Sequence, residues 1–322
     1  MAPTGEPNES SEFAYRDATT EDRDEVLAFT ASTWEHGDYI ADVYDEWLGD
    51  TSGRFLVAVE AASGRIAAID KLSFIRPGEA WFEGLRVNPD FRGRGLASHT
   101  QRHMIEVARG QGARTIRLLT RADNHPVHAM AYRDGFRLLM LTRFWRWRRD
   151  ATSATSPHRE ASRDEGLALR EALPTEARGL HDWWLRSSAY ASHGLVHGDW
   201  RLGSTTPHEW EDAARRGGLL VAAGYSQAEA RLAPALAMIE ARGSEPEGDR
   251  RSIAALGGMP GDMARLLQAL ADFALARGIN ELFGFFPDSV EVYRALESAG
   301  FAPDPDDERY CVFELVLEPP VS

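Results

Sequence analysis

Hydrophobic and polar positions follow two different periods in the first half of the chain. Period-two alternation and short apolar runs predict strands near residues 13–17, 54–60, 65–75, 79–87, 115–120 and 138–148. Helical spacing predicts helices near residues 20–33, 39–48, 96–110 and 125–133. Gly110 and Gly112 end the third helix before the next strand begins. The order of these elements predicts an α/β domain with a mixed sheet.

The second half of the chain repeats the pattern of the first half. Residues 13–18 (FAYRDA) match residues 167–172 (LALREA), and residues 55–59 (FLVAV) match residues 219–223 (LLVAA). Gly135-Phe136, near the end of the first half, corresponds in the same way to Gly300-Phe301. The offset between matched residues drifts only from 154 to 165 positions. A period this long indicates a domain duplicated in tandem, because solenoid repeats are much shorter.

Two polar segments delimit the expected domains. Residues 149–166 are rich in Ser, Thr and charged residues and almost free of apolar side chains, which predicts a linker. Residues 1–12 are polar and lack the apolar core of a secretory signal, which predicts a disordered tail. We therefore expect one domain over residues 13–148 and a second over residues 167–318.

The composition argues against several classes of function. No apolar run approaches the roughly 18 residues of a membrane span, so no membrane partner is expected. The net charge of −14 argues against non-specific binding to nucleic acid, which needs a basic footprint. Cys311 is the only cysteine, so no disulfide can form within the chain, and a reducing, cytoplasmic location is expected. Its apolar neighbours predict a buried structural thiol.

Residues 85–97, LRVNPDFRGRGLA, join the end of a strand to the start of a helix through a loop with two glycines. Such a connection lets backbone N–H groups and the positive end of the helix converge on a phosphate. The dinucleotide fingerprint fits poorly, because its third small residue would have to be Ser98, and the glycines sit too deep in the turn. A Walker loop is excluded, because the only lysine is Lys71. An ordinary turn that uses the freedom of glycine is the alternative.

The spacing Arg92-x-x-Gly95-x-Ala97 resembles the pyrophosphate loop of the GCN5-related N-acetyltransferase (GNAT) superfamily. The order of elements over nearly all of residues 13–148 is also similar to that fold. The resemblance implies acetyl-CoA as co-substrate, with the backbone of the preceding strand holding the acetyl group and pantetheine. The residues implied in binding it are Leu85, Arg86, Val87, Arg92, Gly93, Arg94, Gly95, Leu96, Ala97, Ser98 and Asn124.

Glu83 is the best candidate for the general base that an amine acceptor requires. A primary amine is mostly protonated at pH 7, so a base must take its proton before attack. Glu83 lies in an otherwise apolar strand, where a carboxylate is costly unless it is hydrogen-bonded or useful. Strict alternation places it on the same face as Leu85 and Val87. The alternative is an outward-facing residue that pairs with an arginine.

Gly84 and the segment after Asn124 add two expectations. A glycine inside a strand often marks a bulge, and in the resembled family such a bulge frees N–H groups for the thioester carbonyl. Asn124 resembles the Asn of the family's Asn-x-x-Ala helix, although a helix cap would explain it equally well. The family's thiolate-protonating tyrosine falls at Ala131, and Tyr132 stands one position later, a rotation of about 100° on a helix. Its role as the acid is therefore weak, and water is the alternative.

The acceptor is expected near the first two helices. Trp34, Glu35 and Tyr39 are the expected contacts, because aromatic and acidic side chains suit a small polar amine such as an amino acid. Packing of these aromatics into the core is the alternative, and it is favoured for Trp47. Residues 31–48, together with EGLRV and RGRG, are also similar to histidine N-acetyltransferase-like proteins. His99 and His103 lack the Glu of a zinc-binding H-E-x-x-H helix, so no metal is expected.

The second half lacks the features that carry this chemistry. Its counterpart of the phosphate loop has lost the arginine, and Asp262 places a negative charge at the helix start. We therefore expect one active site, in the first domain of a monomer or homodimer. The expected activity is transfer of an acetyl group from acetyl-CoA to a primary amine of a small molecule by direct attack. The alternatives are a protein N-terminal or lysine acetyltransferase and a non-catalytic acyl-CoA-binding regulatory module.

Overall fold

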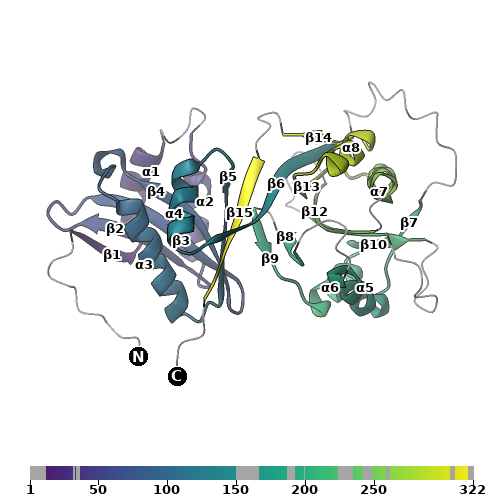
Figure 1. Cartoon of the computed structure of the whole chain (residues 1–322), viewed down its shortest axis with the longest axis horizontal. Coiled ribbons are helices and arrows are strands. Elements are labelled where there is room, and N and C mark those ends of the chain that lie inside the picture. The colour runs from purple at the N-terminus through teal and green to yellow at the C-terminus, as the bar shows by residue number, and fades with distance from the viewer. Residues whose placement is uncertain are drawn as a thin grey trace. The chain divides into compact units, whose positions relative to one another are not determined.

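The computed structural model describes residues 12–31, 33, 37–149, 167–186, 193–198, 200–223, 235–241, 249–258, 262–304 and 309–317. The predicted tail except Glu12, and the predicted linker except Arg149, lie outside these ranges. The chain forms two compact units. The first comprises residues 1–119, 126–137 and 313–322, and the second comprises residues 120–125 and 138–312. Figure 1 labels the helices and strands of both units.

The first unit is built on a mixed sheet, as the alternation predicts. Strands β1 (Phe13–Asp17), β2 (Arg54–Glu60), β3 (Ile66–Arg76) and β4 (Glu79–Val87) are antiparallel neighbours, and β5 (Thr115–Arg121) runs parallel to β4. The helices are α1 (Arg23–Thr30), α2 (Ile40–Gly49), α3 (Leu96–Gly110) and α4 (His125–Arg133), and two short 3-10 helices are η1 (Thr20–Asp22) and η2 (Pro89–Phe91). The predicted strands and helices of residues 13–133 are thus confirmed.

Helices cover both faces of this sheet (Figure 1). Tyr44 and Trp47 of α2 pack with Phe55 and Ile69 of the sheet in one core cluster. On the opposite face, the core cluster of β2, β3 and α3 has Leu96 among its buried residues. Because both faces are apolar, the inner strands β2 and β3 read as nearly continuous hydrophobic runs.

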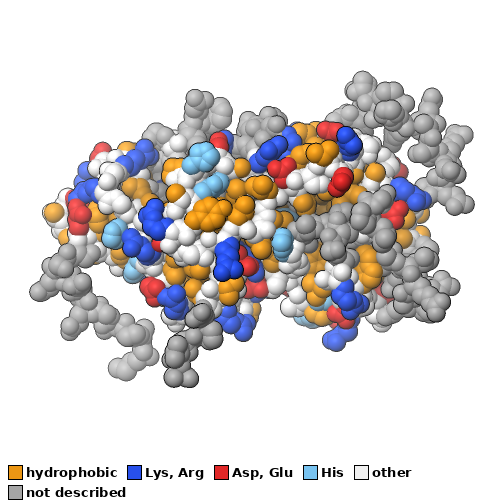
Figure 2. Space-filling view, in the orientation of Figure 1, with side chains coloured by type: hydrophobic (Ala, Val, Ile, Leu, Met, Phe, Trp, Pro, Cys, Tyr) orange, Lys and Arg blue, Asp and Glu red, His pale blue; other side chains and the backbone are white. Residues whose placement is uncertain are grey.

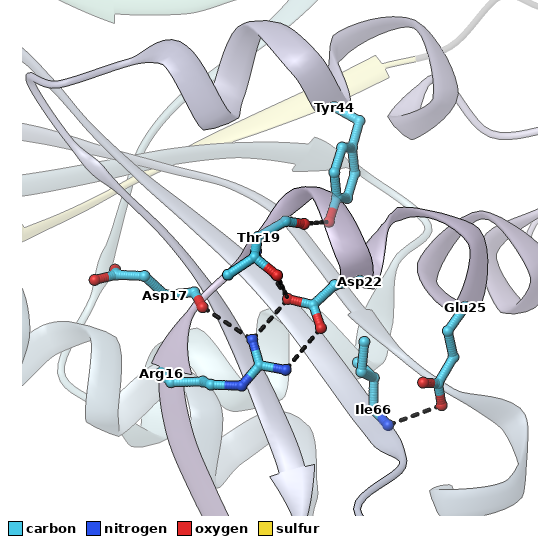
Figure 3. A network of polar contacts seen from close by, with 7 residues as sticks. All are labelled: Arg16, Asp17, Thr19, Asp22, Glu25, Tyr44 and Ile66. Carbon is cyan, nitrogen blue, oxygen red and sulfur yellow. Dashed lines mark hydrogen bonds and ion pairs between the residues drawn. The ribbon is translucent and has the colours of Figure 1, made fainter.

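A network of polar contacts fixes the start of α1 against β1 (Figure 3). Arg16 donates two hydrogen bonds of 2.6 Å to the carboxylate of Asp22, and the Thr19 N–H donates to the same carboxylate at 2.8 Å. The Tyr44 hydroxyl donates to the Thr19 carbonyl at 2.8 Å. This last bond joins α2 to the same turn, so the two helices on this face share one anchor.

The second unit repeats this anchor at the same sequence spacing. Arg170 donates hydrogen bonds of 2.8 and 2.7 Å to Glu176, and the Leu173 N–H donates to that carboxylate at 2.8 Å. Arg170 and Glu176 are the counterparts of Arg16 and Asp22 at an offset of 154 residues. The tandem duplication that the sequence predicts is therefore also present in the side-chain contacts.

The second unit has the same architecture as the first. Its sheet has the order β7 (Leu169–Glu171), β10 (Leu219–Ala222), β11 (Leu236–Ala241), β12 (Arg250–Gly257), β13 (Glu281–Pro287) and β6 (Arg137–Arg148). Its helices are α5 (Pro174–Arg186), α6 (Pro207–Arg215), α7 (Met263–Arg277) and α8 (Val290–Ser298). Strands β8 (Val196–Gly198), β9 (Arg201–Gly203) and β14 (Ala302–Pro303) also belong to it, and β15 (Arg309–Val316) begins in this unit and ends in residues of the first. Leu219 and Val221 face one core and Leu220 the other, so helices cover both faces.

The two units do not follow the expected continuous ranges at their ends. β6, expected as the last strand of residues 13–148, pairs with β13 from Arg148 opposite Glu281 to Thr142 opposite Pro287. Trp145 and Trp147 of β6 are buried in the core beneath α7. Conversely, residues 313–322 belong to the first unit. Alternation predicts β6 as a strand correctly, but it does not say with which partner that strand pairs.

The surface charges, the helix lengths and the single cysteine concern the expectations drawn from composition. Acidic and basic side chains are interspersed on the face that Figure 2 shows. Across the part of the chain that the structure describes, no helix is both long and apolar enough to cross a membrane. Cys311 is a free thiol with 4% of its surface exposed, and burial raises its pKa. The predicted buried cysteine is thus confirmed.

Candidate functional site

A β-bulge in β4 lies at the centre of the candidate site. Lys71 pairs with Glu83 and Ile69 pairs with Arg86, so Gly84 and Leu85 together oppose the single residue Asp70. Gly84 has a φ of +75°, in the left-handed region that favours glycine. A glycine in this strand was expected to mark a bulge, and the register confirms that expectation.

The bulge changes which side chains share a face of β4. Directly opposed residues lie on the same face of a sheet, and Ile69 and Lys71 share one face of β3. Glu83 and Arg86 therefore lie on the same face. The expectation that Glu83 aligns with Leu85 and Val87 is wrong, because the extra residue of the bulge shifts the alternation by one position.

Glu83 is half-buried and held by a hydroxyl. Ser73 of β3 donates a hydrogen bond of 3.0 Å to Glu83 Oε1. Ser73 is 2% exposed, which fixes the position of its hydroxyl. The carboxylate of Glu83 thus has a fixed orientation next to the bulge, as a general base requires.

Asp70, opposite the bulge, is a buried carboxyl that the sequence reasoning missed. It is 2% exposed, and its Oδ1 accepts a hydrogen bond of 3.0 Å from the Lys71 N–H. Burial raises the pKa of Asp70 well above its usual value, against the opposing effects of this hydrogen bond and of Arg86. A carboxylate in the apolar run IAAIDKLSFI is the same signal that singled out Glu83.

Trp47 forms the wall next to the bulge. A Cβ atom at Gly84 would lie 2.3 Å from Trp47 Cη2, so the indole occupies the space that any other residue would need. Trp47 is 3% exposed and packs edge-on to Phe55 and to Tyr39, with ring centroids 5.3 and 6.1 Å apart. The prediction that Trp47 is a core residue is confirmed, and its position also places it beside the site.

Asp38 and Arg86 form a buried ion pair on the same side of the sheet. Arg86 Nε lies 2.6 Å from Asp38 Oδ2, and Arg86 Nη2 lies 3.2 Å from Asp38 Oδ1. The Arg86 guanidinium carbon lies 5.3 Å from the centre of the Tyr39 ring. Burial raises the pKa of the Tyr39 hydroxyl, although the nearby positive charge of Arg86 lowers it. The surroundings of the hydroxyl are buried, but the residue as a whole is 43% exposed, so part of its surface is accessible to an acceptor.

The loop after β4 has the geometry of an anion site. The Asn88 side chain donates to the Ile66 carbonyl at 3.0 Å and accepts from the Asp90 N–H at 3.1 Å, which holds the turn in place. Gly93 and Gly95 have φ values of +78° and +72°. Gly95 is the N-cap residue of α3 and offers no side-chain hydrogen bond, and the first turn of α3 has no acidic residue. The N–H groups of that turn are therefore oriented to bind an anion.

The polar side chains of the loop differ in the contacts that they make. Arg94 forms ion pairs with Glu60 at 3.0 Å and with Glu12, and its guanidinium packs on Phe13. Its side chain is therefore directed to the edge of the sheet, and only its backbone lines the loop. Arg92 is exposed and has no ion pair within the described ranges. Ser98 Oγ accepts a hydrogen bond of 3.0 Å from Arg133 of α4, which adds a positive charge near the loop.

The α4 region supplies the last sequence-predicted residues. Asn124 directly precedes α4 and donates to Thr120 Oγ1 at 3.0 Å. Ala131, at the position of the family's tyrosine, is fully buried. Tyr132 is 54% exposed, and its ring packs edge-on to Phe313 at 5.3 Å. Trp34 and Glu35 lie outside the described residues.

The second unit keeps the bulge but fills the space beside it. Met238 pairs with Ala255 and Ile239 with Ile253, so Ala254 is an extra residue in β12, the counterpart of β4. Trp184 Nε1 donates a hydrogen bond of 2.8 Å to the carbonyl of Leu256. A Cβ atom at Gly257 would lie 2.7 Å from Trp183. Two tryptophans therefore cover the β12 backbone, and no carboxylate takes the position of Glu83.

The histidines and carboxylates in the described part of the chain do not form a metal centre. No three His, Cys, Asp or Glu side chains there come together in a way that would hold an ion. His103 stacks on Tyr15 with ring centroids 4.1 Å apart, and burial lowers its pKa. This histidine therefore packs against β1.

Comparison with known sequences gives matches to part of the chain. Residues 17–136 match the sequence profile of the Acetyltransferase (GNAT) family. Histidine N-acetyltransferase of Oreochromis niloticus is 34% identical over 95 residues, which is 29% of this chain and 28% of that protein. Probable N-acetyltransferase 16 of Homo sapiens is 34% identical over 109 residues, which is 33% of this chain and 29% of that protein. The matched region thus spans less than a third of each relative.

Comparison with solved structures covers nearly the whole chain. A GCN5-related N-acetyltransferase from Sphaerobacter thermophilus has a TM-score of 0.62 at 17% identity, with 96% of this chain and 97% of that chain covered. A tandem GNAT protein from the clavulanic acid biosynthesis pathway has a TM-score of 0.55 at 15% identity, with 96% and 100% covered. At these identities the likeness establishes the fold, which is a GNAT fold in tandem. The sequence profile alone assigns residues 17–136 to a GNAT domain, and the structural likeness adds the fold.

Proposed function

We propose that the first unit transfers an acetyl group from acetyl-CoA to a primary amine of a small molecule, with Glu83 as general base. The observation that carries the proposal is the continuous arrangement along residues 83–98. A hydrogen-bonded carboxylate, a glycine bulge and an uncapped helix start follow one another on a single connection. These three features supply a base, backbone donors and an anion site for one transfer reaction.

The proposed reaction is direct attack without a covalent enzyme intermediate. Glu83 takes one proton from the ammonium form of the amine. The neutral nitrogen then attacks the thioester carbonyl carbon, a C–N bond forms, the C–S bond breaks, and the nitrogen releases its second proton to solvent. Backbone N–H groups of the bulge stabilise the negative charge on the carbonyl oxygen. The first turn of α3, with Arg92 beside it, holds the pyrophosphate of the CoA.

We further propose that water protonates the departing thiolate. Tyr132 is directed toward Phe313, and the position of the family's tyrosine is a buried alanine. The CoA thiolate is a tolerable leaving group, so solvent can supply the proton. Ala131 stands where the family has its tyrosine, and this observation favours a non-catalytic acyl-CoA-binding module as the second candidate function.

A free amino acid is the acceptor class that we favour. Tyr39 presents an exposed aromatic surface on the face that also carries Glu83 and Arg86. The relatives include a protein named for histidine as its acceptor, although the match covers only 28% of that protein. Free histidine therefore comes first in the panel of amines to be tested, before other amino acids, polyamines and peptides.

The Glu83→Gln variant should lower kcat about 100-fold or more, in the range expected for loss of a general base. The amide keeps the size of the side chain and its contact with Ser73, so the dissociation constant for CoA should stay within about twofold of wild type. Thiol release from acetyl-CoA in the presence of the amine panel measures the first quantity, and calorimetry measures the second. The limb of the pH–rate profile that reports Glu83 should also disappear.

The control for this variant is Glu106→Gln, which changes an exposed carboxylate on α3 that pairs with Arg109. It should leave kcat and the pH profile unchanged. Wild-type protein that binds CoA but shows no acceptor-dependent thiol release with any amine would favour the binding module. A Glu83→Gln profile identical to that of the wild type would remove Glu83 as the base.

We also propose that the second unit is a degenerate copy that does not bind CoA. Its helix start carries Asp262, and Trp184 already bonds the β12 backbone. Calorimetry should therefore show one CoA per full-length chain. Ala97→Glu, which places a carboxylate in the first turn of α3, should weaken binding at least 100-fold by repelling the pyrophosphate.

The matched variant in the second unit is Ala264→Glu. Ala264 is half-buried and second in α7, as Ala97 is half-buried and second in α3. It should leave the single CoA site unchanged. Two binding sites in the wild type, or a loss of binding with Ala264→Glu, would show that the second unit takes part in binding.

A further inference from the structure

We propose that Asp38 is a positioning residue for acetyl transfer, which acts through Arg86 to lock the backbone of the β4 bulge. The inference rests on the proposed function for the catalytic step, but the lock itself is a property of the fold. Neither Asp38 nor Arg86 needs to touch the reacting atoms in this role. Their task is to hold the peptide that follows Gly84 in one orientation.

The ion pair is two-pronged and nearly inaccessible to solvent. The side chains of Arg86 and Asp38 are 14% and 1% exposed, and two donor–acceptor distances of 2.6 and 3.2 Å join them. A buried ion pair contributes little net stability, because desolvation of both charges offsets their attraction. Its directional geometry is therefore the property that distinguishes it from an apolar contact.

The guanidinium of Arg86 also holds a backbone group of the bulge. Arg86 Nη1 donates a hydrogen bond of 3.1 Å to the carbonyl of Leu85, the second residue of the bulge. The bulge interrupts the regular ladder between β3 and β4, so this peptide has fewer neighbours to orient it. Asp38 orients the guanidinium, and the guanidinium in turn orients the Leu85–Arg86 peptide.

Asp38 also attaches the ion pair to the start of α2. Asp38 Oδ1 accepts a hydrogen bond of 3.2 Å from the Ile40 N–H, so one carboxylate binds both α2 and Arg86. Tyr39 then lies beneath the guanidinium, and Trp47 of the same helix fills the space at Gly84. Tyr39 and Trp47, which lie on the side where we expect the acceptor, are thereby connected to the backbone of the bulge.

This connection has a direct consequence for the reaction. The backbone donors of the bulge must lie where the negative charge of the transition state develops. A displacement of about 1 Å in such a group can cost about 100-fold in rate. Loss of the lock should therefore lower kcat, whereas loss of a simple acceptor contact would raise KM.

The test compares Asp38→Asn and Arg86→Lys with Asp17→Asn. Asn keeps the shape of the carboxylate without its charge, and Lys keeps the charge without the planar fork. Asp17 and Arg54 form a similar two-pronged pair, at 2.6 and 2.8 Å, but it is exposed and lies outside the site. Both lock variants should lower kcat at least 10-fold with both substrates saturating, and Asp38→Asn should leave CoA affinity within twofold. Asp17→Asn should change neither.

Hydrogen exchange of the peptides that cover residues 81–90 gives a readout that does not depend on turnover. Exchange there should be faster in both lock variants than in the wild type and in Asp17→Asn. A rise in acceptor KM with unchanged kcat, or unchanged exchange in Asp38→Asn, would overturn the proposal. Wild-type protein without acetyl transfer would refute the proposed function, and the exchange result would still decide whether Asp38 holds the bulge.

Discussion

Replacement of Gly84 by alanine is expected to destabilise the first unit by about 2 to 4 kcal/mol and to reduce kcat/KM at least 100-fold. Two effects add. A non-glycine residue at a φ of +75° costs about 1 kcal/mol. The new methyl group would also lie 2.3 and 2.6 Å from two ring carbons of Trp47, a contact too short to tolerate. The indole is rigid and buried, so either it or the bulge must move.

Gly64→Ala is the matched control for this variant. Gly64 has a φ of +72° in the turn between β2 and β3, and a Cβ atom there would meet nothing within 4 Å. It should show the backbone cost alone, with full activity. Adding Trp47→Leu to Gly84→Ala should restore part of the stability, because it removes the ring atoms that clash. Equal destabilisation by Gly64→Ala and Gly84→Ala in chemical denaturation would contradict the role assigned to Trp47.

Removal of the negative charge at Asp50 is expected to be the most destabilising conservative change in the first unit. The only lysine of the chain, Lys71, is fully buried, and its Nζ lies 2.5 Å from Asp50 Oδ2 and 3.0 Å from the Leu72 carbonyl. Asp50→Asn leaves this ammonium buried without its counter-ion, which costs about 3 to 5 kcal/mol. Gly53 allows the arrangement, because a Cβ atom there would lie 2.8 Å from Nζ.

Lys71→Met should cost much less, on the order of 1 kcal/mol. The carboxylate of Asp50 is 23% exposed and also accepts hydrogen bonds from the N–H and hydroxyl of Ser52, so it tolerates loss of the lysine. The double variant Asp50→Asn/Lys71→Met should therefore be close to Lys71→Met alone. Denaturation of the four proteins in one buffer measures the coupling directly. Additive losses in the double variant would contradict this account.

The same pair predicts an acid-dependent loss of stability. Partial burial raises the pKa of Asp50, but hydrogen bonds from Lys71 and Ser52 outweigh it and lower the pKa to about 2. Because the folded-state pKa lies below the unfolded value, the stabilisation is complete above about pH 4 and is lost as the pH falls toward about 2. In Lys71→Met this part of the acid dependence should shrink. An identical acid profile in that variant would show that other carboxylates dominate.

These ion pairs also explain how α2 is placed. Asp38 at its start binds Arg86 of β4, and Asp50 at its end binds Lys71 of β3. The helix between them carries Trp47, which fills the space at Gly84. Both ends of α2 are thus attached to the two strands that form the bulge. Nothing in the spacing of these residues along the chain indicates either pairing.

Local patterns in the sequence were sufficient to predict the elements and the duplication. Alternation and helical spacing determine strands and helices within a few residues, because each element must bury one face or stripe. The Arg16–Asp22 and Arg170–Glu176 anchors are local in the same sense, because each joins two residues six positions apart in the chain. The glycines after β4 and the lack of a side-chain cap on α3 are likewise properties of one continuous segment, so the strand–loop–helix connection was predictable from residues 85–97.

The remaining features depend on contacts between residues that are distant in the chain. One inserted residue at Gly84–Leu85 moved Arg86 onto the face of Glu83, and only the register against β3 reveals that shift. Tyr132 contacts Phe313, and β6 pairs with β13, across more than 130 residues of sequence in each case. Periodicity reports which side of an element is apolar, but not which partner covers it. The sequence thus carried the resemblance to the GNAT family, the repeat and the loop that we propose as the phosphate site, whereas long-range packing set the geometry around Glu83.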